Sequence, residues 1–216
     1  GTLWNTYAFY VLYAEIDKFD PTGINVKDCA LTVMDRWILS ELNSLVRFVD
    51  EGLEKYQITE TARKIEEFTD VLSNWYVRRC RERYWGSDMT DDKKAAYATL
   101  AHVLTTLSKV IAPYVPFVAE SIYQNIVRSV DKTAPESVHL TSFPVCDDSL
   151  VDKDLERNME RLTDVVVLGR SARNAANIKN RQPLSKLYII SEGGEKFGGE
   201  LTDILADELN VKQVEY

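Results

Sequence analysis

Four consecutive stretches of the chain repeat apolar residues at intervals of three and four, and this spacing restricts the possible folds more than any other feature. The stretches lie near residues 34–53, 59–85, 91–111 and 116–127. Turn-forming residues separate them, including Gly86 and the prolines Pro113 and Pro116, which a helix interior does not tolerate. Each stretch has one apolar face. The pattern predicts a mainly α-helical protein built on an antiparallel helix bundle.

Different patterns flank these four stretches. Residues 3–19 are rich in aromatic side chains and predict a helix that ends at a turn beginning at Asp20. After an irregular stretch, a long helix is expected over residues 152–177, followed by a small α/β appendage. That appendage has a strand at 187–190, a helix at 200–208 and a strand at 211–215. The expected domains are a connecting helix (1–28), the bundle (29–150), a long helix with a basic end (151–180) and the start of a small α/β module (181–216).

The residue inventory argues against several classes of function. The three cysteines are odd in number and far apart, which indicates a reducing, cytoplasmic compartment. His102 and His139 are too far apart to match a structural zinc motif, and no glycine-rich phosphate loop is present. No apolar run approaches the roughly 20 residues that cross a membrane. The sequence therefore predicts no catalytic residue, no metal site, no bound cofactor and no membrane segment.

Positive charge gathers in two places on a chain whose formal net charge is −8. Four arginines and one glutamate lie between Trp75 and Trp85, and five cations with no acidic residue lie in residues 170–186. We call these the first and second basic segments. Such segments on an otherwise acidic chain favour an acidic partner held at a defined place.

Helical phase separates the arginines of the first basic segment. At about 100° per residue, Arg79 and Arg83 share a stripe with Leu72, and an ion pair inside the protein explains them at least as well as RNA binding does. Arg78 and Arg81 are expected at the surface. The second basic segment suits RNA better, because it runs from a helix into a polar turn that offers forked guanidinium donors and amide groups.

Several separated motifs resemble one family, the class I aminoacyl-tRNA synthetases for isoleucine, valine and leucine, in their anticodon-binding region. The shared motifs are residues 35–40 (DRWILS), 74–79 (NWYVRR) and 111–120 (IAPYVPFVAE). Further segments resemble the isoleucyl-tRNA synthetases in particular, namely residues 137–140 (SVHL), 143–144 (FP), 173–174 (RN), 177–179 (NIK), 181–184 (RQPL) and 208–212 (ELNVK).

This resemblance implies that the chain is a piece of a longer enzyme. It would bind the anticodon stem-loop of tRNA-Ile next to the parent's catalytic body, which would use ATP and Mg²⁺. The family's ATP-site signatures, His-Ile-Gly-His and Lys-Met-Ser-Lys-Ser, are absent, so the fragment itself is expected to have no enzyme activity. The RNA-binding candidates are Arg78, Arg81, Arg170, Arg173, Lys179 and Arg181 for phosphate, and Asn180 and Gln182 for base edges.

Two alternatives stay open at this point. The anticodon-binding domain of a valine or leucine enzyme shares the general motifs. A helical scaffold that docks partner proteins shares the bundle but predicts an exposed apolar groove instead of a basic face. Arg36 and Lys93 are weaker RNA candidates, since each has an acidic neighbour and fits an ordinary surface position.

Overall fold

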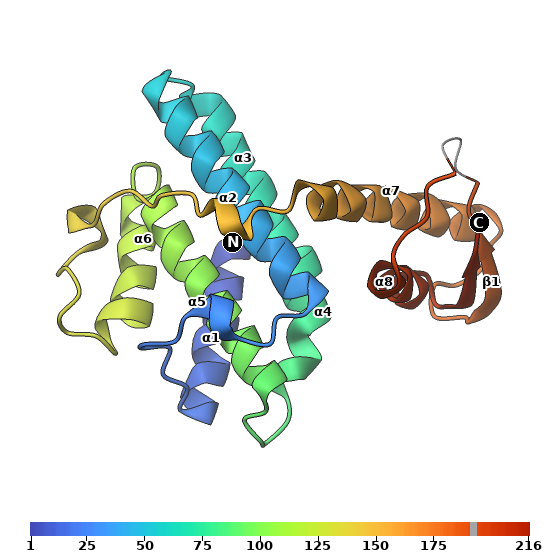
Figure 1. Ribbon diagram of the computed structural model, residues 1–216, viewed down its shortest axis with the longest axis horizontal. Coiled ribbons are helices and arrows are strands. Elements are labelled where there is room, and N and C mark those ends of the chain that lie inside the picture. Colours follow the sequence, from blue (N-terminus) through green and yellow to red (C-terminus); the bar gives the residue numbers. More distant parts are fainter. Residues whose placement is uncertain (191–193) are drawn as a thin grey trace. The chain divides into compact units, whose positions relative to one another are not determined.

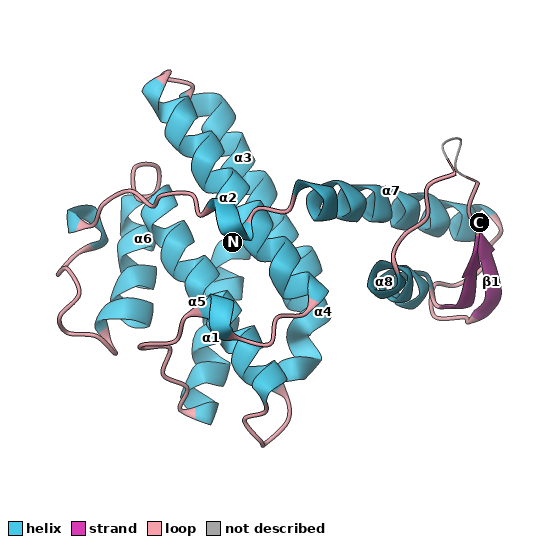
Figure 2. Cartoon of the chain, in the orientation of Figure 1, coloured by secondary structure: helices cyan, strands magenta, loops and turns pink. Residues whose placement is uncertain are grey.

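Helices dominate the computed structural model, as the apolar spacing predicts (Figures 1 and 2). The structure describes residues 1–190 and 194–216, so residues 191–193 of the expected α/β module lie outside the described residues. Two compact units are present, Gly1–Val151 and Asp152–Tyr216. The mainly α-helical class with a small C-terminal strand pair is confirmed.

The first unit contains the helices α1 (Thr2–Asp17), α2 (Val33–Glu54), α3 (Ile58–Val71), α4 (Arg78–Cys80), α5 (Asp91–Ile111) and α6 (Pro116–Tyr123). Helix α2 packs against α3 and α5, and α5 packs against α6 and α1. Aliphatic side chains of α2 and α5, such as Leu42 and Leu104, are fully buried and form the centre of the core. Helix α1 thus belongs to the same unit as the bundle, in which α2 and α3 form a tight hairpin (Figure 1).

Local chemistry fixes where the main helices begin. The Thr32 hydroxyl accepts a bond from the Asp35 N–H (3.3 Å) and the Asp35 carboxylate accepts one from the Thr32 N–H (2.9 Å), so α2 starts with a capping box. The Thr90 hydroxyl caps α5 in the same way, by accepting a bond from the Lys93 N–H at 3.1 Å. Pro116 occupies the first turn of α6, where its missing N–H leaves no bond unmade.

Two wide π-helical turns interrupt the helices, at Leu72–Val77 and Gln124–Arg128. The first turn lies between α3 and α4, and a 3-10 turn (Arg81–Tyr84) follows α4. We call this continuous helical segment, residues 58–84, the α3–α4 path. A π turn adds one residue without breaking the helix, so the residues beyond it are rotated by about 100°. Cys80 and Tyr84 consequently occupy the buried stripe, where uniform α-helical phase places Arg79 and Arg83.

The second unit consists of α7 (Lys153–Ala175), β1 (Leu184–Tyr188), α8 (Gly199–Leu209) and β2 (Val211–Glu215). The strands pair in parallel, with Leu184 opposite Val211, so α8 is the crossover of a βαβ unit. Strand β1 begins three residues before the predicted start, whereas β2 matches its prediction.

Helix α7 covers α8, and close packing at one glycine permits it. A Cβ atom on Gly169 would lie 2.6 Å from Cδ1 of Leu209. Met159, Leu162 and Val166 of α7 are buried, whereas Ala172 is exposed. The buried residue at that end of the helix is Arg173.

Candidate nucleic-acid interface

Arg78 and Arg81 of the first basic segment lie at the surface, as predicted. Arg78 Nε donates to the Asn74 carbonyl at 2.8 Å, and its guanidinium stands 5.6 Å from the centre of the Trp75 ring. The Arg81 guanidinium lies 5.8 Å from the centre of the Phe9 ring. These aromatic contacts order the long side chains while leaving both arginines exposed to solvent, where a phosphate can reach them.

Arg83 is held inside the first unit, which confirms the predicted internal ion pair. Its guanidinium binds the buried Asp35 of α2 through two bonds, of 2.8 and 2.9 Å. Tyr76 also donates its hydroxyl to Asp35 at 2.6 Å. Burial alone would raise the pKa of the Asp35 carboxyl, but the bonds and charge of Arg83, with help from Tyr76, outweigh burial and lower it. Arg79, the other arginine on the predicted inward stripe, is half-buried.

Arg173 of the second basic segment lies in the interior, with an exposed fraction of 5%. Its terminal nitrogens donate to the backbone carbonyls of Lys179, Gln182, Leu209 and Asn210. The predicted phosphate contact therefore does not fit this residue, because its guanidinium faces the backbone of its own unit. The sequence motif shows a cation but not the direction in which the helix turns it.

Two other cations of the second basic segment are engaged with carboxylates. Arg170 forms an ion pair with Glu208 of α8 at 2.6 Å and keeps 42% of its side chain exposed. Lys186 of β1 is paired with Glu215 of β2 across the strand pair. The Lys186–Glu215 pair is partly exposed on both sides and is therefore weak, so phosphate can compete for Lys186. The Glu208 side chain is only 2% exposed, so its pair with Arg170 is costly to break, and phosphate can reach only the remaining donors of that guanidinium.

The turn between α7 and β1 carries the remaining candidates. Lys179, Asn180, Arg181 and Gln182 all have exposed side chains. Their backbone is tied inward, since Gln182 N–H donates to the Lys179 carbonyl at 3.0 Å and the Asn210 amide donates to the Asn180 carbonyl at 3.4 Å. The structure therefore brings these four candidates together on one fixed turn, which we call the basic turn (residues 179–182).

The two weaker candidates from the sequence behave differently from each other. Lys93 is buried, not a surface group: it pairs with Asp17 of α1 at 2.6 Å and donates to the Gly86 carbonyl. Arg36 is exposed and donates to the Leu31 carbonyl at 3.1 Å. Lys93 thus fastens α1 to the start of α5, a role that its acidic neighbours in the sequence do not reveal.

Several residues of the family motifs have structural partners. Glu120 of α6 accepts bonds from the Ser137 hydroxyl (2.8 Å) and the Val138 N–H (3.0 Å). Burial opposes ionisation of Glu120, but these bonds and a Gln124 contact prevail and lower its pKa. Two motifs far apart in sequence therefore hold each other in place, as Asp35 and Tyr76 also do. The sequence contains no spacing signal for either pairing.

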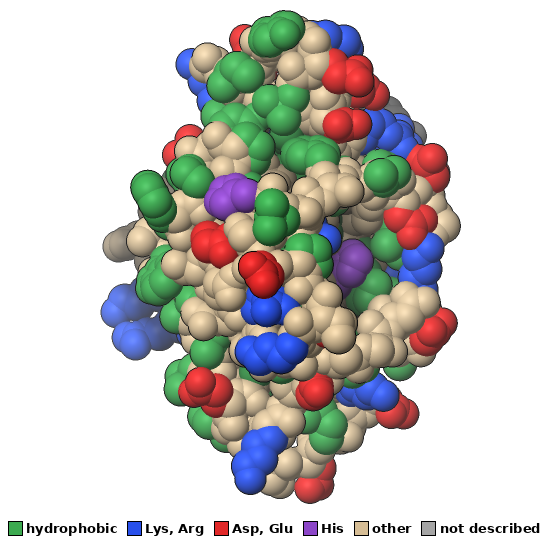
Figure 3. Space-filling view, turned by 90° about the vertical axis from the view of Figure 1, so that its left-hand side faces the viewer, with side chains coloured by type: hydrophobic (Ala, Val, Ile, Leu, Met, Phe, Trp, Pro, Cys, Tyr) green, Lys and Arg blue, Asp and Glu red, His purple; other side chains and the backbone are tan. Residues whose placement is uncertain are grey.

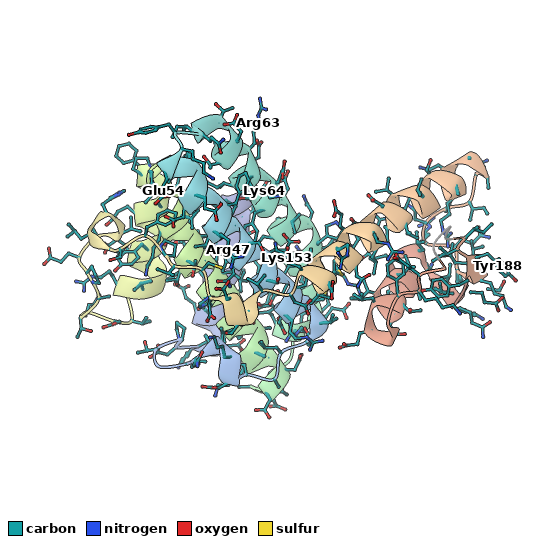
Figure 4. The ribbon with its side chains drawn as sticks, turned by 45° about the horizontal axis from the view of Figure 1, so that its top comes forward. Arg47, Glu54, Arg63, Lys64, Lys153 and Tyr188 are labelled. Atoms are coloured by element: carbon teal, nitrogen blue, oxygen red, sulfur yellow. The ribbon has the colours of Figure 1, made fainter. Side chains whose placement is uncertain are left out.

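Charge is mixed on the face of the molecule drawn in Figure 3, where Lys and Arg side chains are interspersed with Asp and Glu and form no single positive field. In the second unit, Tyr188 lies on the outer side of the strand pair with 68% of its surface exposed (Figure 4).

Across residues 1–190 and 194–216, no cluster of His, Cys, Asp and Glu can hold a metal ion, and no helix there is suited to span a membrane.

Comparison with known proteins identifies the class to which this arrangement belongs. Residues 35–189 match the family "Anticodon-binding domain of tRNA ligase", and the chain belongs to that family. It is 55% identical over its whole length to the isoleucine–tRNA ligase of Clostridium novyi (strain NT) and 54% identical to that of Clostridium acetobutylicum. An isoleucine–tRNA ligase of Dehalococcoides mccartyi is 48% identical over 97% of the chain. The resemblance indicated by the motifs is thus confirmed. The chain spans about a fifth of the length of these relatives.

Proposed function

We propose that the chain is the tRNA-binding region of an isoleucine–tRNA ligase. It grips the anticodon stem-loop of tRNA-Ile so that the acceptor end reaches the catalytic body of the parent enzyme, which supplies ATP- and Mg²⁺-dependent aminoacylation in the cytoplasm. The observation that carries this proposal is the basic turn, a fixed loop with two cations and two amides exposed together, in a chain that belongs to an anticodon-binding family.

The division of labour follows from side-chain chemistry. Lys179 and Arg181, together with Arg78 and Arg81 of the other unit, supply phosphate contacts that do not depend on base identity. Asn180 and Gln182 carry both donors and acceptors and are suited to the edges of unpaired anticodon bases. Arg170 contributes in a secondary way, because its guanidinium has donors beyond those that Glu208 occupies.

The test is a titration of the chain against labelled tRNA-Ile and an anticodon-swapped version, followed by fluorescence anisotropy at two salt concentrations. We expect tighter binding to the native anticodon and a steep loss of affinity with salt. Equal affinity for both RNAs would mean that the chain binds the phosphate backbone of the RNA without recognising the anticodon bases. Failure to bind either RNA at low salt would overturn the proposal and leave a protein-docking scaffold in its place.

A pair of variants locates the grip on the surface. Arg181→Ala should weaken binding about tenfold and reduce the salt dependence by about one phosphate contact. The matched control is Arg63→Ala, which removes an exposed arginine on α3 outside both basic segments (Figure 4). Equal effects of the two substitutions would show that RNA binding depends on the general positive charge of the surface and not on the basic turn.

A further inference from the structure

The two terminal nitrogens of the Arg173 guanidinium bind two different segments of backbone. One terminal nitrogen donates to the carbonyls of Lys179 (3.0 Å) and Gln182 (2.9 Å), which bracket the basic turn. The other donates to the carbonyls of Leu209 (2.5 Å) and Asn210 (3.2 Å), where α8 passes into β2. One side chain therefore ties the turn to the α8–β2 junction.

Helix ends explain how a buried cation is tolerated at this place. Arg173 stands in the last turn of α7, and the Leu209 carbonyl belongs to the last turn of α8. The carboxyl end of a helix carries a partial negative charge, so two helix ends stabilise the guanidinium. Asn177 and Asn210 adopt left-handed backbone just beyond these helices, which turns the chain back at both ends.

The hydrogen bonds from Arg173 fix the backbone of the basic turn but leave the side chains of the turn exposed to solvent. The carbonyls of Lys179 and Gln182 point at Arg173, and the Asn180 carbonyl accepts the Asn210 amide. The side chains of the same residues are exposed. A turn held in this way loses less conformational freedom when a ligand binds than a mobile loop does.

We propose that Arg173 is a positioning residue for RNA binding. It touches no RNA, and it sets the geometry in which Lys179, Asn180, Arg181 and Gln182 meet the anticodon arm. This inference rests on the proposed function and assigns the specificity of the turn to a group buried beneath it.

The substitution Arg173→Lys distinguishes the effect of the guanidinium's hydrogen-bond geometry from the effect of its positive charge. Arg173→Lys keeps the positive charge at the two helix ends but has a single nitrogen in place of a planar fork, so it cannot hold both pieces of backbone. The matched control is Arg157→Lys, the same change at an exposed position of α7 where the arginine pairs with Asp154.

The experiment measures RNA affinity and turn dynamics on the full 216-residue chain. Labelled tRNA-Ile is titrated with five proteins: the unsubstituted chain, Arg173→Lys, Arg181→Ala, the double variant of these two, and the control Arg157→Lys. Hydrogen exchange reports the amides of residues 179–182. We expect faster exchange in Arg173→Lys, about tenfold weaker binding, and a double variant little weaker than either single one. Arg157→Lys should leave both readouts unchanged.

The outcomes distinguish this inference from the function on which it rests. If Arg181→Ala weakens binding while a folded Arg173→Lys chain binds normally, the positioning role is wrong and the tRNA grip stands. Additive losses in the double variant would also overturn the positioning role. If the unsubstituted chain binds neither tRNA, the proposed function fails and this inference fails with it.

A second variant keeps the test available if Arg173→Lys prevents the second unit from folding. Asn210→Gly removes the amide bond to Asn180, while glycine readily adopts the left-handed backbone found at that position. We expect about threefold weaker RNA binding with the helical content intact. Unchanged affinity in this variant would contradict the proposal.

Discussion

Arg83 and Asp35 face each other with both oxygens of the carboxylate engaged, at 2.8 and 2.9 Å from the two terminal nitrogens of the guanidinium. Asp35 also caps the start of α2, so one carboxylate joins the first turn of that helix to the far end of the α3–α4 path. The pair is buried on the aspartate side and nearly so on the arginine side. Removal of Arg83 leaves the buried Asp35 carboxylate without a counter-charge, whereas removal of Asp35 leaves Arg83 with a second ion pair, to Asp92 at 2.9 Å.

Substitution of Arg83 should therefore unfold the first unit more easily. We expect Arg83→Ala to cost about 3–5 kcal/mol, because it strands a buried carboxylate. Urea or thermal unfolding followed by circular dichroism measures the loss. Arg63→Ala is the control, since this exposed arginine on α3 should change stability by less than about 0.5 kcal/mol. Similar losses in both variants would show that the ion pair does not stabilise the fold.

Acidification should destabilise the chain through the same carboxylate. The folded state lowers the pKa of Asp35, chiefly because the bonds to Arg83 overcome the opposing effect of burial. In the unfolded chain the pKa returns to about 4. Between the two pKa values the unfolded state binds more protons, so the stabilisation is complete above about pH 5 and disappears as the pH falls through the folded pKa.

Urea midpoints measured between about pH 2.5 and 6 test this dependence. Asp35→Asn should be less stable at neutral pH and should show a flatter profile on the acid side. Asp17 has a lowered pKa as well, where the Lys93 and Tyr97 contacts outweigh burial, so some acid sensitivity remains in the variant. If the urea midpoint of Asp35→Asn fell with decreasing pH as steeply as that of the unsubstituted chain, other carboxylates would be responsible for the acid sensitivity.

Gly52 lies at a tight contact between α2 and α3. A Cβ atom there would lie 2.3 Å from Cγ2 of Thr61, a buried residue whose hydroxyl accepts a bond from Tyr114. Alanine improves helix propensity by about 1 kcal/mol, but overpacking costs about 1–3 kcal/mol. We expect Gly52→Ala to lower stability by about 1 kcal/mol in a denaturant titration. Thr61→Ser removes the clashing methyl group, so the double variant should recover part of the loss.

The three cysteines should differ in reactivity. Cys80 is buried on the core stripe, and its burial raises the thiol pKa to about 11. Cys29 and Cys146 are only half-buried. Iodoacetamide attacks the thiolate, so Cys80 should be alkylated far more slowly than the other two in the native protein. Mass spectrometry of timed samples measures this, and equal rates in denaturant are the control. Rapid native alkylation of Cys80 would show that the α3–α4 path opens readily.

The sequence predicted the helices well because their evidence is local. Apolar periodicity, the Thr90 cap and Pro116 each act within a few residues, and the corresponding helices appear where expected. The family membership was also predictable, since it depends on motifs spread over the whole chain. Strand β1 was placed three residues late, because its pairing with β2 at Leu184 depends on contacts far along the chain.

The roles of the cations were harder to predict. Arg173 and Lys93 are buried, although neither their charge nor their neighbours in the sequence distinguish them from surface residues. Burial of a cation depends on what the fold brings to it: helix-end carbonyls for Arg173 and the Asp17 carboxylate for Lys93. The exposed members of the basic turn were predicted as RNA contacts, and that assignment stays a proposal.

The wide turn at Leu72–Val77 has a consequence for insertions and deletions. It is a helix carrying one residue more than α-helical winding needs, and the surplus is absorbed without a break in the chain. Deleting a single residue there would restore ordinary winding and leave Cys80, Arg83 and Tyr84 on the faces of the helix that they now occupy. Ordinary winding with every residue retained would instead rotate the chain beyond the turn by about 100° and place Arg79 and Arg83 on the buried stripe in place of Cys80 and Tyr84. This turn should therefore tolerate the loss of one residue better than the gain of one.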